Sequence, residues 1–302
     1  MMKDIIKMLL RRLIPRRIRI LCQLKTENPE ERKLRIQLMD YLKEKNIADT
    51  EEIINYLKSH RIGVFNYFWA DKHIYKVNRI KLDRNNGLYY AILNGKRMYF
   101  KRGMNLESCN AYFNSLLLEQ DDHSPHNYLT KQELKNFEAR TVVDCGAAEG
   151  IFALSVCDKA NEVVLFEADR DWLEALSYTF KDSSNVKIIP KFVGAVSKEN
   201  ITTLDECFMD RKNVDFIKMD IENMECEAIV GASDLLENNK QVKLVVCVYH
   251  SQDEEQRVCE MMKGYKKIIK PGYMVFIYDS EGLKEPYLRH GVIKFEKDNS
   301  CG

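Results

Sequence analysis

The sequence predicts an α/β fold whose core is a mostly parallel, Rossmann-like sheet ending in an antiparallel hairpin, preceded by a small α+β region. From Thr141 onward, short apolar runs alternate with amphipathic helical patterns, as in parallel strands joined by crossover helices. The first run enters a small-residue turn and the second ends on an acid, which is typical of a nucleotide-binding βαβ unit. The last two runs have no helical pattern between them, and such neighbouring strands pair antiparallel. The candidate strands are 141–145, 162–167, 186–190, 214–219 and 242–249, followed by the hairpin of 273–279 with 291–297.

The chain before this sheet divides into a basic segment, residues 1–25, and an α+β accessory region, residues 26–129; the sheet domain occupies 130–298. In the accessory region, Asn28-Pro29 marks the start of a helix that runs to about Lys45. The Asn94-Gly95 pair between two apolar runs predicts a β-hairpin. Further expected elements are a helix from Asp49 or Thr50 to near Gly63, a helix over 105–120, and a helix opened by a capping box at Thr130–Glu133.

Composition restricts the class of protein. A chain of 302 residues can bury a large core and suggests about two domains. Lys and Arg total 47 against 46 Asp and Glu, so the formal net charge of +1 gives no general attraction to nucleic acid. The nine cysteines are an odd number without a C-x-x-C pair, which indicates buried thiols in a reducing cytoplasm rather than disulfides or a zinc site. The abundance of Lys, Ile, Asn and Glu indicates an AT-rich bacterial genome.

The N-terminal segment permits two interpretations. No run of 18 apolar residues is present, so we expect no membrane-spanning helix. Residues 1–25 hold eight basic side chains and one acid among Ile, Met and Leu, without the apolar core or cleavage site of a signal peptide. One interpretation is a basic amphipathic segment on the anionic inner face of the membrane. The other is a solvated helix that packs on its own domain and is broken at Pro15.

The turn after the first strand discriminates between nucleotides. A dinucleotide fold prefers G-x-G-x-x-G, whose second glycine lets the backbone approach a pyrophosphate. Here alanine takes that place and the neighbouring Glu149 would repel a pyrophosphate, so the turn suits a cationic, phosphate-free ligand such as S-adenosylmethionine. Glu167, at the end of the next strand, can accept hydrogen bonds from ribose hydroxyls. An ordinary βα turn punctuated by glycine is the alternative. The candidate cofactor-binding residues are Asp144, Gly146, Ala147, Ala148, Glu149, Gly150, Glu167, Ala168, Asp169 and Asp220.

Polar residues at the carboxyl ends of parallel strands converge at the ligand-binding edge of the sheet. Tyr249-His250 ends one such strand, and His250 is the candidate general base because imidazole titrates near neutral pH. The alternative is a histidine with a purely structural role. Asp220 and Glu222 follow the preceding strand and are the other candidate catalytic residues. Together they can hold Mg²⁺, although acids in a first helical turn are also favoured by the helix dipole.

Several segments together resemble the FkbM family of methyltransferases: VVDCGAAEG, LFEAD, Leu204-Asp205, FIKMDIENMECEAIVGA, and VYH ahead of Gly264-Tyr265. The resemblance covers about residues 120–297 and includes Ser124-Pro125-His126, YMVFIYD and Arg289-His290-Gly291. It implies a class I methyltransferase fold, S-adenosylmethionine as cofactor, and usually O-methylation, often of sugar-containing products such as surface polysaccharides. By position, Gly146–Gly150 and Glu167 would contact the cofactor. The residues that would border the acceptor are Asp220, Glu222, Glu225, Tyr249, His126 and Arg289.

One position departs from the family pattern. Where the family usually has D-x-E-G-x-E, this chain has Asn223 in place of glycine, and asparagine tolerates a left-handed backbone. We therefore expect an S-adenosylmethionine-dependent O-methyltransferase acting on a sugar or glycolipid-type acceptor, with His250 as the base. The alternatives are a nicotinamide-dependent oxidoreductase, which the missing middle glycine disfavours, and a non-catalytic cofactor-binding or adaptor protein.

Overall fold

The computed structural model describes residues 24–74, 76–209, 213–239, 241–277 and 282–297. The helices are α3 (Pro29–Lys45), α4 (Thr50–Leu57), α5 (Asp71–Ile74), α6 (Leu106–Glu119), α7 (Lys131–Lys135), α8 (Ile151–Val156), the 3₁₀ helix η1 (Cys157–Lys159), α9 (Arg170–Thr179), α10 (Leu204–Cys207), α11 (Glu225–Val230), α12 (Ser233–Asn238) and α13 (Glu254–Met261). The strands are β1 (Lys81–Leu82), β2 (Tyr89–Leu93), β3 (Lys96–Tyr99), β4 (Ala139–Cys145), β5 (Ala160–Phe166), β6 (Val186–Ile189), β7 (Phe192–Val193), β8 (Ile201–Thr202), β9 (Val214–Met219), β10 (Lys243–Cys247), β11 (Tyr265–Ile269) and β12 (Val292–Lys297).

A seven-stranded sheet forms the centre, in the order β11-β12-β10-β9-β4-β5-β6. Five neighbouring strands, from β10 to β6, run parallel, and β12 pairs antiparallel with both β10 and β11. The order reverses direction beside β4, so the crevice at the carboxyl ends of β4 and β9 is the expected ligand-binding position. The predicted α/β fold of the class I methyltransferase type is confirmed.

The antiparallel hairpin at the sheet end is also confirmed, but the prediction of 273–279 as its first strand is wrong. The strand is β11, with Tyr265 opposite Lys297 and Ile269 opposite Ile293. The apolar run from Tyr273 onward is instead buried beside the accessory region, where the Val275 amide donates to the Val64 carbonyl at 2.9 Å. A run that is buried outside a sheet has the same apolar pattern as a buried strand, so sequence periodicity does not separate the two.

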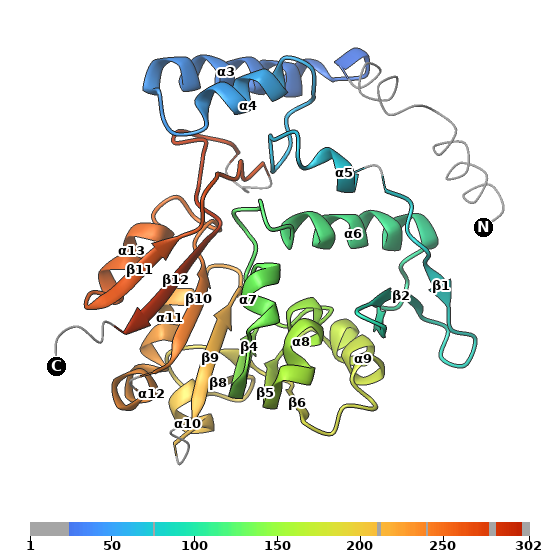
Figure 1. Cartoon of the computed structure of the whole chain (residues 1–302), viewed down its shortest axis with the longest axis vertical. Helices are drawn as coiled ribbons and strands as arrows, with labels where there is room; N and C mark the ends of the chain where they lie inside the picture. The colour runs from blue at the N-terminus through green and yellow to red at the C-terminus, as the bar shows by residue number, and fades with distance from the viewer. Residues whose placement is uncertain (1–23, 75, 210–212, 240, 278–281, 298–302) are drawn as a thin grey trace.

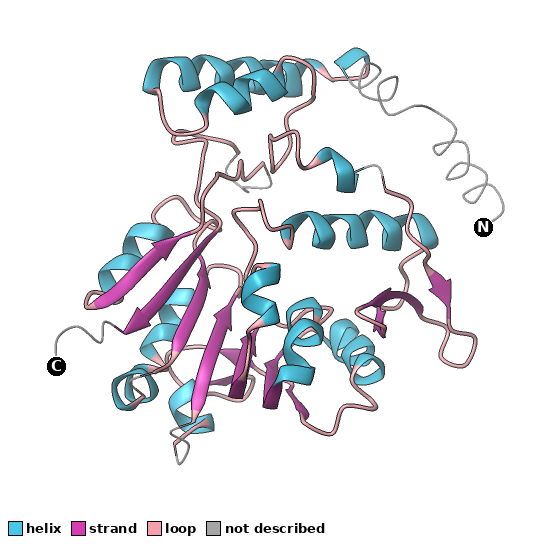
Figure 2. Ribbon diagram, viewed as in Figure 1, coloured by secondary structure: helices cyan, strands magenta, loops and turns pink. Residues whose placement is uncertain are grey.

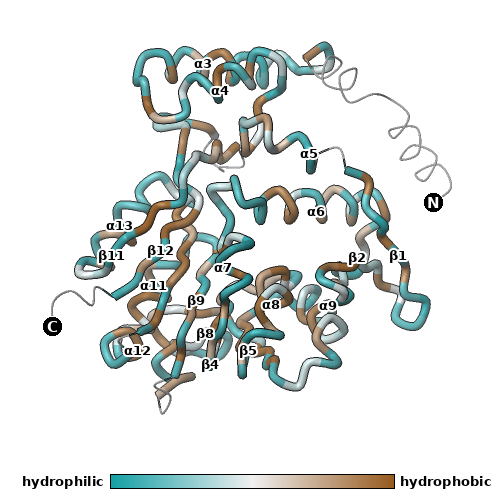
Figure 3. Tube along the Cα trace, in the orientation of Figure 1, coloured by the Kyte–Doolittle hydropathy of each residue, from teal (hydrophilic) through white to brown (hydrophobic). Residues whose placement is uncertain are grey.

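Helices cover both faces of the sheet (Figures 1 and 2). Side chains alternate along β4: Val142 packs in the cluster that includes α6 and α8, whereas Val143 packs with α10, α11 and α12. Both valines are fully buried. In Figure 3 the central strands carry long hydrophobic stretches, as expected for parallel strands that are covered on both sides.

The accessory region packs on the sheet domain in two places. The helices α3 and α4 share an apolar cluster with the segment before β12, in which Leu42 and Leu57 accompany Val275 and Leu288. The hairpin of β2 and β3, with α6, instead packs against α8 and α9. Figure 1 shows α3 to α6 on the side of the sheet where β4 and β9 end, so the accessory region covers the expected ligand-binding edge.

Three local predictions in this region are confirmed, whereas the second helix, α4, ends at Leu57 instead of near Gly63. The Asn28 side chain accepts from the Glu31 amide at 2.9 Å and caps α3, with Pro29 as its first residue. Asn94 and Gly95 take positive φ values of 50° and 80° in the turn between β2 and β3. Thr130 and Glu133 form the expected reciprocal capping box of α7.

The remaining sequence expectations concern the basic N-terminal segment, membrane-spanning helices and the cysteines. Residues 1–23 of the basic segment lie outside the described residues. Within the described ranges, no helix is long and apolar enough to cross a membrane. The cysteines of these ranges are free thiols, and four of them are buried: Cys109, Cys145, Cys157 and Cys247.

Candidate active site

The turn between β4 and α8 requires glycine at two positions. Gly146 and Gly150 have φ values of 75° and 83°, a conformation that side chains rarely adopt. A Cβ on Gly146 would lie 2.0 Å from the backbone oxygen of Asp220, and one on Gly150 would lie 2.8 Å from the Phe180 ring. The close approach at Gly146 brings the turn directly against Asp220, the residue that follows β9, so the two predicted halves of the site are in contact.

Glu167 holds the turn from the neighbouring strand. One carboxylate oxygen accepts from the Ala148 amide at 2.7 Å, and the other accepts from the Asp169 amide at 2.8 Å. The side chain is partly exposed, and each oxygen keeps a further lone pair for a ribose hydroxyl. Asp169 itself caps α9 by accepting from the Asp171 amide at 2.8 Å, so its carboxylate has a structural role; Ala168 lies between the two.

Asp144 lies beneath the turn instead of facing a ligand. It is 1 % exposed, and its carboxylate lies 3.0 Å from the Lys218 ammonium. Burial raises the pKa of Asp144, and the Lys218 charge opposes that rise. Lys218 also donates to the Gly146 carbonyl at 2.6 Å, so the buried pair fixes the backbone of the turn. Sequence analysis did not identify Lys218, which occupies an otherwise apolar strand.

Glu149 is buried and faces the accessory region. Its carboxylate accepts a hydrogen bond of 2.6 Å from the Tyr112 hydroxyl on α6. Burial raises the pKa of Glu149, and the Tyr112 hydrogen bond opposes that rise. A carboxylate at this place adds negative potential near the turn, which agrees with the predicted preference for a cationic ligand over a pyrophosphate.

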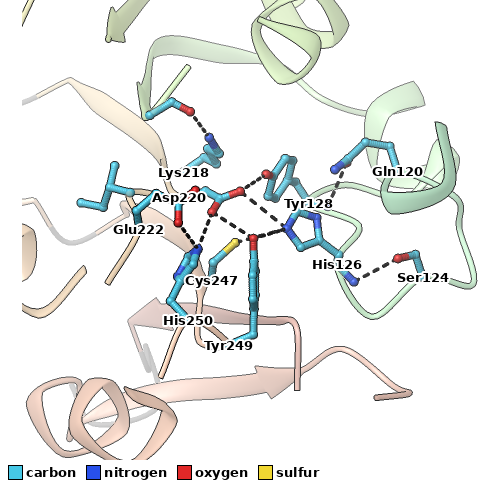
Figure 4. Close-up of polar contacts among 12 residues, drawn as sticks. Gln120, Ser124, His126, Tyr128, Lys218, Asp220, Glu222, Cys247, Tyr249 and His250 are labelled. Atoms are coloured by element: carbon cyan, nitrogen blue, oxygen red, sulfur yellow. Dashed lines mark hydrogen bonds and ion pairs between the residues drawn. The ribbon is translucent and has the colours of Figure 1, made fainter. Parts of the chain in front are cut away.

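Asp220 is the centre of the polar site (Figure 4). Two tyrosine hydroxyls donate to it, Tyr128 at 2.5 Å and Tyr249 at 3.4 Å. Two imidazole nitrogens flank it, with Nε2 of His126 at 3.5 Å and Nε2 of His250 at 3.2 Å. Burial alone would raise the pKa of Asp220, but the two histidines and Lys218 outweigh burial and hold it well below its usual range. Asp220 is therefore an anion at neutral pH.

His250 is placed as predicted, but its surroundings argue against the predicted role of general base. Its Nδ1 lies 3.4 Å from the carboxylates of both Glu225 and Glu254, opposite the Asp220 contact of Nε2. Burial would lower its pKa, yet hydrogen bonding to Asp220 and Glu254 raises the pKa of His250 to about 10. At neutral pH the ring is an imidazolium, which has no lone pair to take a proton. Its role here is to fix and neutralise the surrounding carboxylates.

The two other predicted acids, Glu222 and Glu225, differ in exposure. Glu222 has a φ of 56° and a side chain that is 92 % exposed, 4.0 Å from Nε2 of His250. Glu225 is fully buried, accepts from the Ile221 amide at 2.8 Å, and has a pKa raised by burial to about 8. Asn223 takes a φ of 73°, the left-handed backbone expected at a position where asparagine stands in place of glycine.

The residues do not fit the predicted magnesium site. Mg²⁺ prefers oxygen ligands in octahedral geometry. Glu222 faces solvent, and Asp220 is already flanked by two imidazoles and two phenols. Asp220, Glu225 and His250 lie close enough together to hold a transition metal. However, Nε2 of His250 faces Asp220, whereas Nδ1 faces Glu225. Only one of these nitrogens could be a ligand to a given ion.

Arg289 holds the backbone next to the Asp220 cluster. It is buried, donates to the Tyr249 carbonyl at 2.6 Å, and lies 5.3 Å from the centre of the Phe276 ring. Together with His126, which contacts the Tyr249 hydroxyl at 3.2 Å, it fixes the tyrosine next to Asp220. Each of the predicted substrate residues His126, Tyr249 and Arg289 therefore belongs to one connected network.

Comparison with known proteins assigns the domain. Residues 184–270 match the family described as methyltransferase FkbM domain. The predicted resemblance to FkbM methyltransferases is confirmed over these residues. The match supports an S-adenosylmethionine-dependent methyltransferase and gives no support to a nicotinamide-dependent oxidoreductase. Comparison with curated proteins gave no match.

Solved structures similar to this chain include the following three. A precorrin-6y C5,15-methyltransferase from Geobacter metallireducens is 14 % identical, with a TM-score of 0.39 over 55 % of this chain and 85 % of that chain. A putative methyltransferase from Streptococcus mutans in complex with SAH is 11 % identical, with a TM-score of 0.39 over 54 % and 90 %. Fibrillarin from Aeropyrum pernix with bound S-adenosyl-L-methionine is 13 % identical, with a TM-score of 0.38 over 73 % and 99 %.

Proposed function

We propose that this methyltransferase transfers the methyl group of S-adenosylmethionine to a hydroxyl of a sugar or glycoconjugate acceptor, of the kind used to build surface polysaccharides. The observation that carries the proposal is the position of Asp220. It is a partly exposed carboxylate directly after β9, and its backbone lies against Gly146 of the cofactor turn. Side chains from two other segments hold it, Tyr128 from one and Tyr249 and His250 from the other. A fixed carboxylate at that place can accept a hydrogen bond from an acceptor hydroxyl and aim its oxygen.

The residues of the turn fit the cofactor. Glu167 offers lone pairs to ribose hydroxyls, and Glu149 adds negative charge near the turn. S-adenosylmethionine supplies an electrophilic methyl group on a positively charged sulfur, so an anionic pocket favours its binding.

On the acceptor side, the protein positions groups rather than supplying an attacking nucleophile of its own. Tyr128 and Tyr249 orient Asp220 through hydrogen bonds, and burial raises the pKa of both phenols well above the ordinary value, so they remain donors. The Asp220 side chain is only 18 % exposed, and this low exposure strengthens these interactions.

The test of this proposal is a transfer assay with S-adenosylmethionine and a panel of saccharides, with methyl incorporation followed by carbon-13 NMR. We expect a signal from a methyl ether. Each responsive saccharide is matched by its deoxy analogue, which should accept nothing at the deleted position. Methylation of nitrogen or carbon, or no transfer to any saccharide, would contradict the proposal.

We also propose that the enzyme acts on the cytoplasmic side of the membrane, where glycan precursors are assembled. The eight basic side chains of residues 1–25 support peripheral contact with anionic lipid. Sedimentation with anionic liposomes should then weaken when residues 1–25 are deleted. Equal sedimentation of the two forms would favour the alternative, a segment that packs on its own domain.

A further inference from the structure

We propose that Glu119, supplied by the accessory region, is the general base that removes the proton from the acceptor hydroxyl. The inference rests on the proposed function, because it requires a hydroxyl acceptor. It gives the accessory region a catalytic contribution in addition to its role in covering the ligand-binding edge.

The first support is the direction in which α6 presents the side chain. Tyr112 and Glu119 are seven residues apart, so they lie on the same face of the helix. Tyr112 reaches Glu149 of the cofactor turn at 2.6 Å, and Leu116 between them is buried. This face therefore points to the site, and Glu119 is its last residue.

The second support is the way in which the end of α6 is anchored. Gln120 follows Glu119 directly, and its backbone carbonyl accepts from the Asn127 side chain at 2.9 Å. Its side-chain oxygen accepts from the Tyr128 amide at 3.3 Å. Tyr128 in turn donates to Asp220, so a short chain of hydrogen bonds fixes the end of α6 relative to the central carboxylate.

The third support is that no neighbouring side chain or backbone group neutralises or hydrogen-bonds the Glu119 carboxylate in the described part of the chain. Among the described residues its side chain makes no hydrogen bond and no ion pair, unlike those of Glu149, Glu167 and Glu225. Its carboxylate is partly exposed. An unpartnered carboxylate beside the polar cluster around Asp220 is free to accept a proton from a ligand.

The electrostatic surroundings suit a base that works near neutral pH. Burial raises the pKa of Glu119 to about 7, His126 opposes that rise, and Glu149 and Asp220 add to it. The carboxyl end of a helix also disfavours a negative charge. The titratable groups that face Glu119 are His126, Glu149, Asp220, Tyr112 and Tyr249.

The step balances without another reactant. The acceptor oxygen forms its bond to the methyl carbon as the bond from carbon to sulfur breaks, and the sulfur takes that electron pair. The hydroxyl proton moves to the Glu119 carboxylate and afterwards to solvent. His250, an imidazolium between three carboxylates, does not take part as a proton acceptor.

The experiment compares wild type with Glu119→Gln across pH 5.5 to 8.5, using the saccharide that the wild-type enzyme methylates. Wild-type kcat/KM should rise with pH through about 7, because the base must be deprotonated. The variant should lose kcat by about 10²–10⁴-fold and lose this acid limb, while its affinity for S-adenosylhomocysteine changes less than about twofold. Glu119→Asp should keep the acid limb with a smaller loss of kcat.

Glu107→Gln is the matched control, because it makes the same chemical change on the same helix, about 18 Å away by helix rise. It should leave kcat and the pH profile unchanged. A Glu119→Gln enzyme that keeps kcat within about threefold, or keeps the acid limb, overturns the inference. If the wild type methylates no saccharide, the proposed function fails, and the inference is then tested by carbon-13 NMR of the carboxyl groups. We expect one carboxyl signal that titrates near pH 7 in the wild type and is missing from Glu119→Gln. If the wild type has no such signal, the inference is overturned.

Discussion

On the cofactor side of the site, the contacts are short in sequence, whereas on the acceptor side they join distant segments. Glu167 reaches the turn at Ala148 across 19 residues, within one βαβ unit. Tyr128 reaches Asp220 across 92 residues, and His126 reaches Tyr249 across 123. The ribose-facing part of the cofactor side is therefore determined by one supersecondary motif, with added support from Lys218 on β9 and Tyr112 on α6. The acceptor side depends on how the accessory region and the loop after α6 pack over the sheet. The predictions below test this division.

Gly146→Ala should have the largest effect on stability, because Gly146 is where the cofactor turn contacts the Asp220 backbone. The new Cβ would lie 2.0 Å from the Asp220 backbone oxygen and would require a φ of 75°. We expect a loss of about 4 kcal/mol of unfolding free energy from combined overpacking and strain, measured by urea denaturation. Gly95→Ala is the control, since its φ is 80° but nothing lies within 4 Å of the new atom. It should lose about 1 kcal/mol; equal losses would show that the close approach is unimportant.

Asp220→Asn should have the next largest effect, and it should act mainly on the acceptor side. The amide keeps the size of the side chain but removes the charge that two imidazoles face. We expect kcat to fall about 300-fold, with affinity for S-adenosylhomocysteine changed less than about threefold. If cofactor binding falls as much as kcat, Asp220 belongs to the cofactor side and the division is wrong.

His250→Gln should destabilise the fold by about 3 kcal/mol at pH 6, since it leaves buried carboxylates without their cation. The folded pKa of about 10 exceeds the ordinary value of 6.5, so the stabilisation is complete below pH 6.5 and is lost as pH rises through 10. The difference in unfolding free energy between wild type and variant should therefore shrink from pH 6 to pH 10. His123→Gln, at a histidine side chain that is 67 % exposed, should cost less than about 1 kcal/mol. A difference for His250→Gln that grows with pH would mean that the ring is neutral when folded.

Glu167→Gln should have the smallest effect and act on the cofactor side alone. The amide can replace one of the two backbone hydrogen bonds, but it loses the charge-assisted contact to ribose. We expect affinity for S-adenosylhomocysteine to fall about tenfold by calorimetry, which corresponds to about 1.4 kcal/mol, and kcat at saturating cofactor to stay within about twofold. A loss confined to kcat would remove Glu167 from the cofactor site.

The same division explains how much of the site the sequence predicted. The turn, Glu167 and the left-handed Asn223 follow from local backbone rules, and these predictions agree with the structure. The positions of Asp220 and His250 follow from the rule that strand ends converge. The pKa of His250 could not be predicted, because it depends on Glu254, one helical turn onward, and on Glu225 from another strand end.

Residues from outside the predicted motifs were missed for a related reason. Tyr112, Glu119 and Tyr128 belong to the accessory region, whose sequence patterns predicted its helices and hairpin but not its docking on the sheet. One available signal was the charge of Lys218 inside a buried strand, which indicates a buried partner such as Asp144. The misplaced strand at 273–279 has the same origin, because its apolar side chains are buried against the accessory helices.

The most direct test of the account is calorimetric titration of the purified enzyme with S-adenosylhomocysteine and, separately, with NAD. The account predicts saturable binding of S-adenosylhomocysteine, weakened by Glu167→Gln and retained by Asp220→Asn, and no heat with NAD. Binding of NAD without binding of S-adenosylhomocysteine would contradict it.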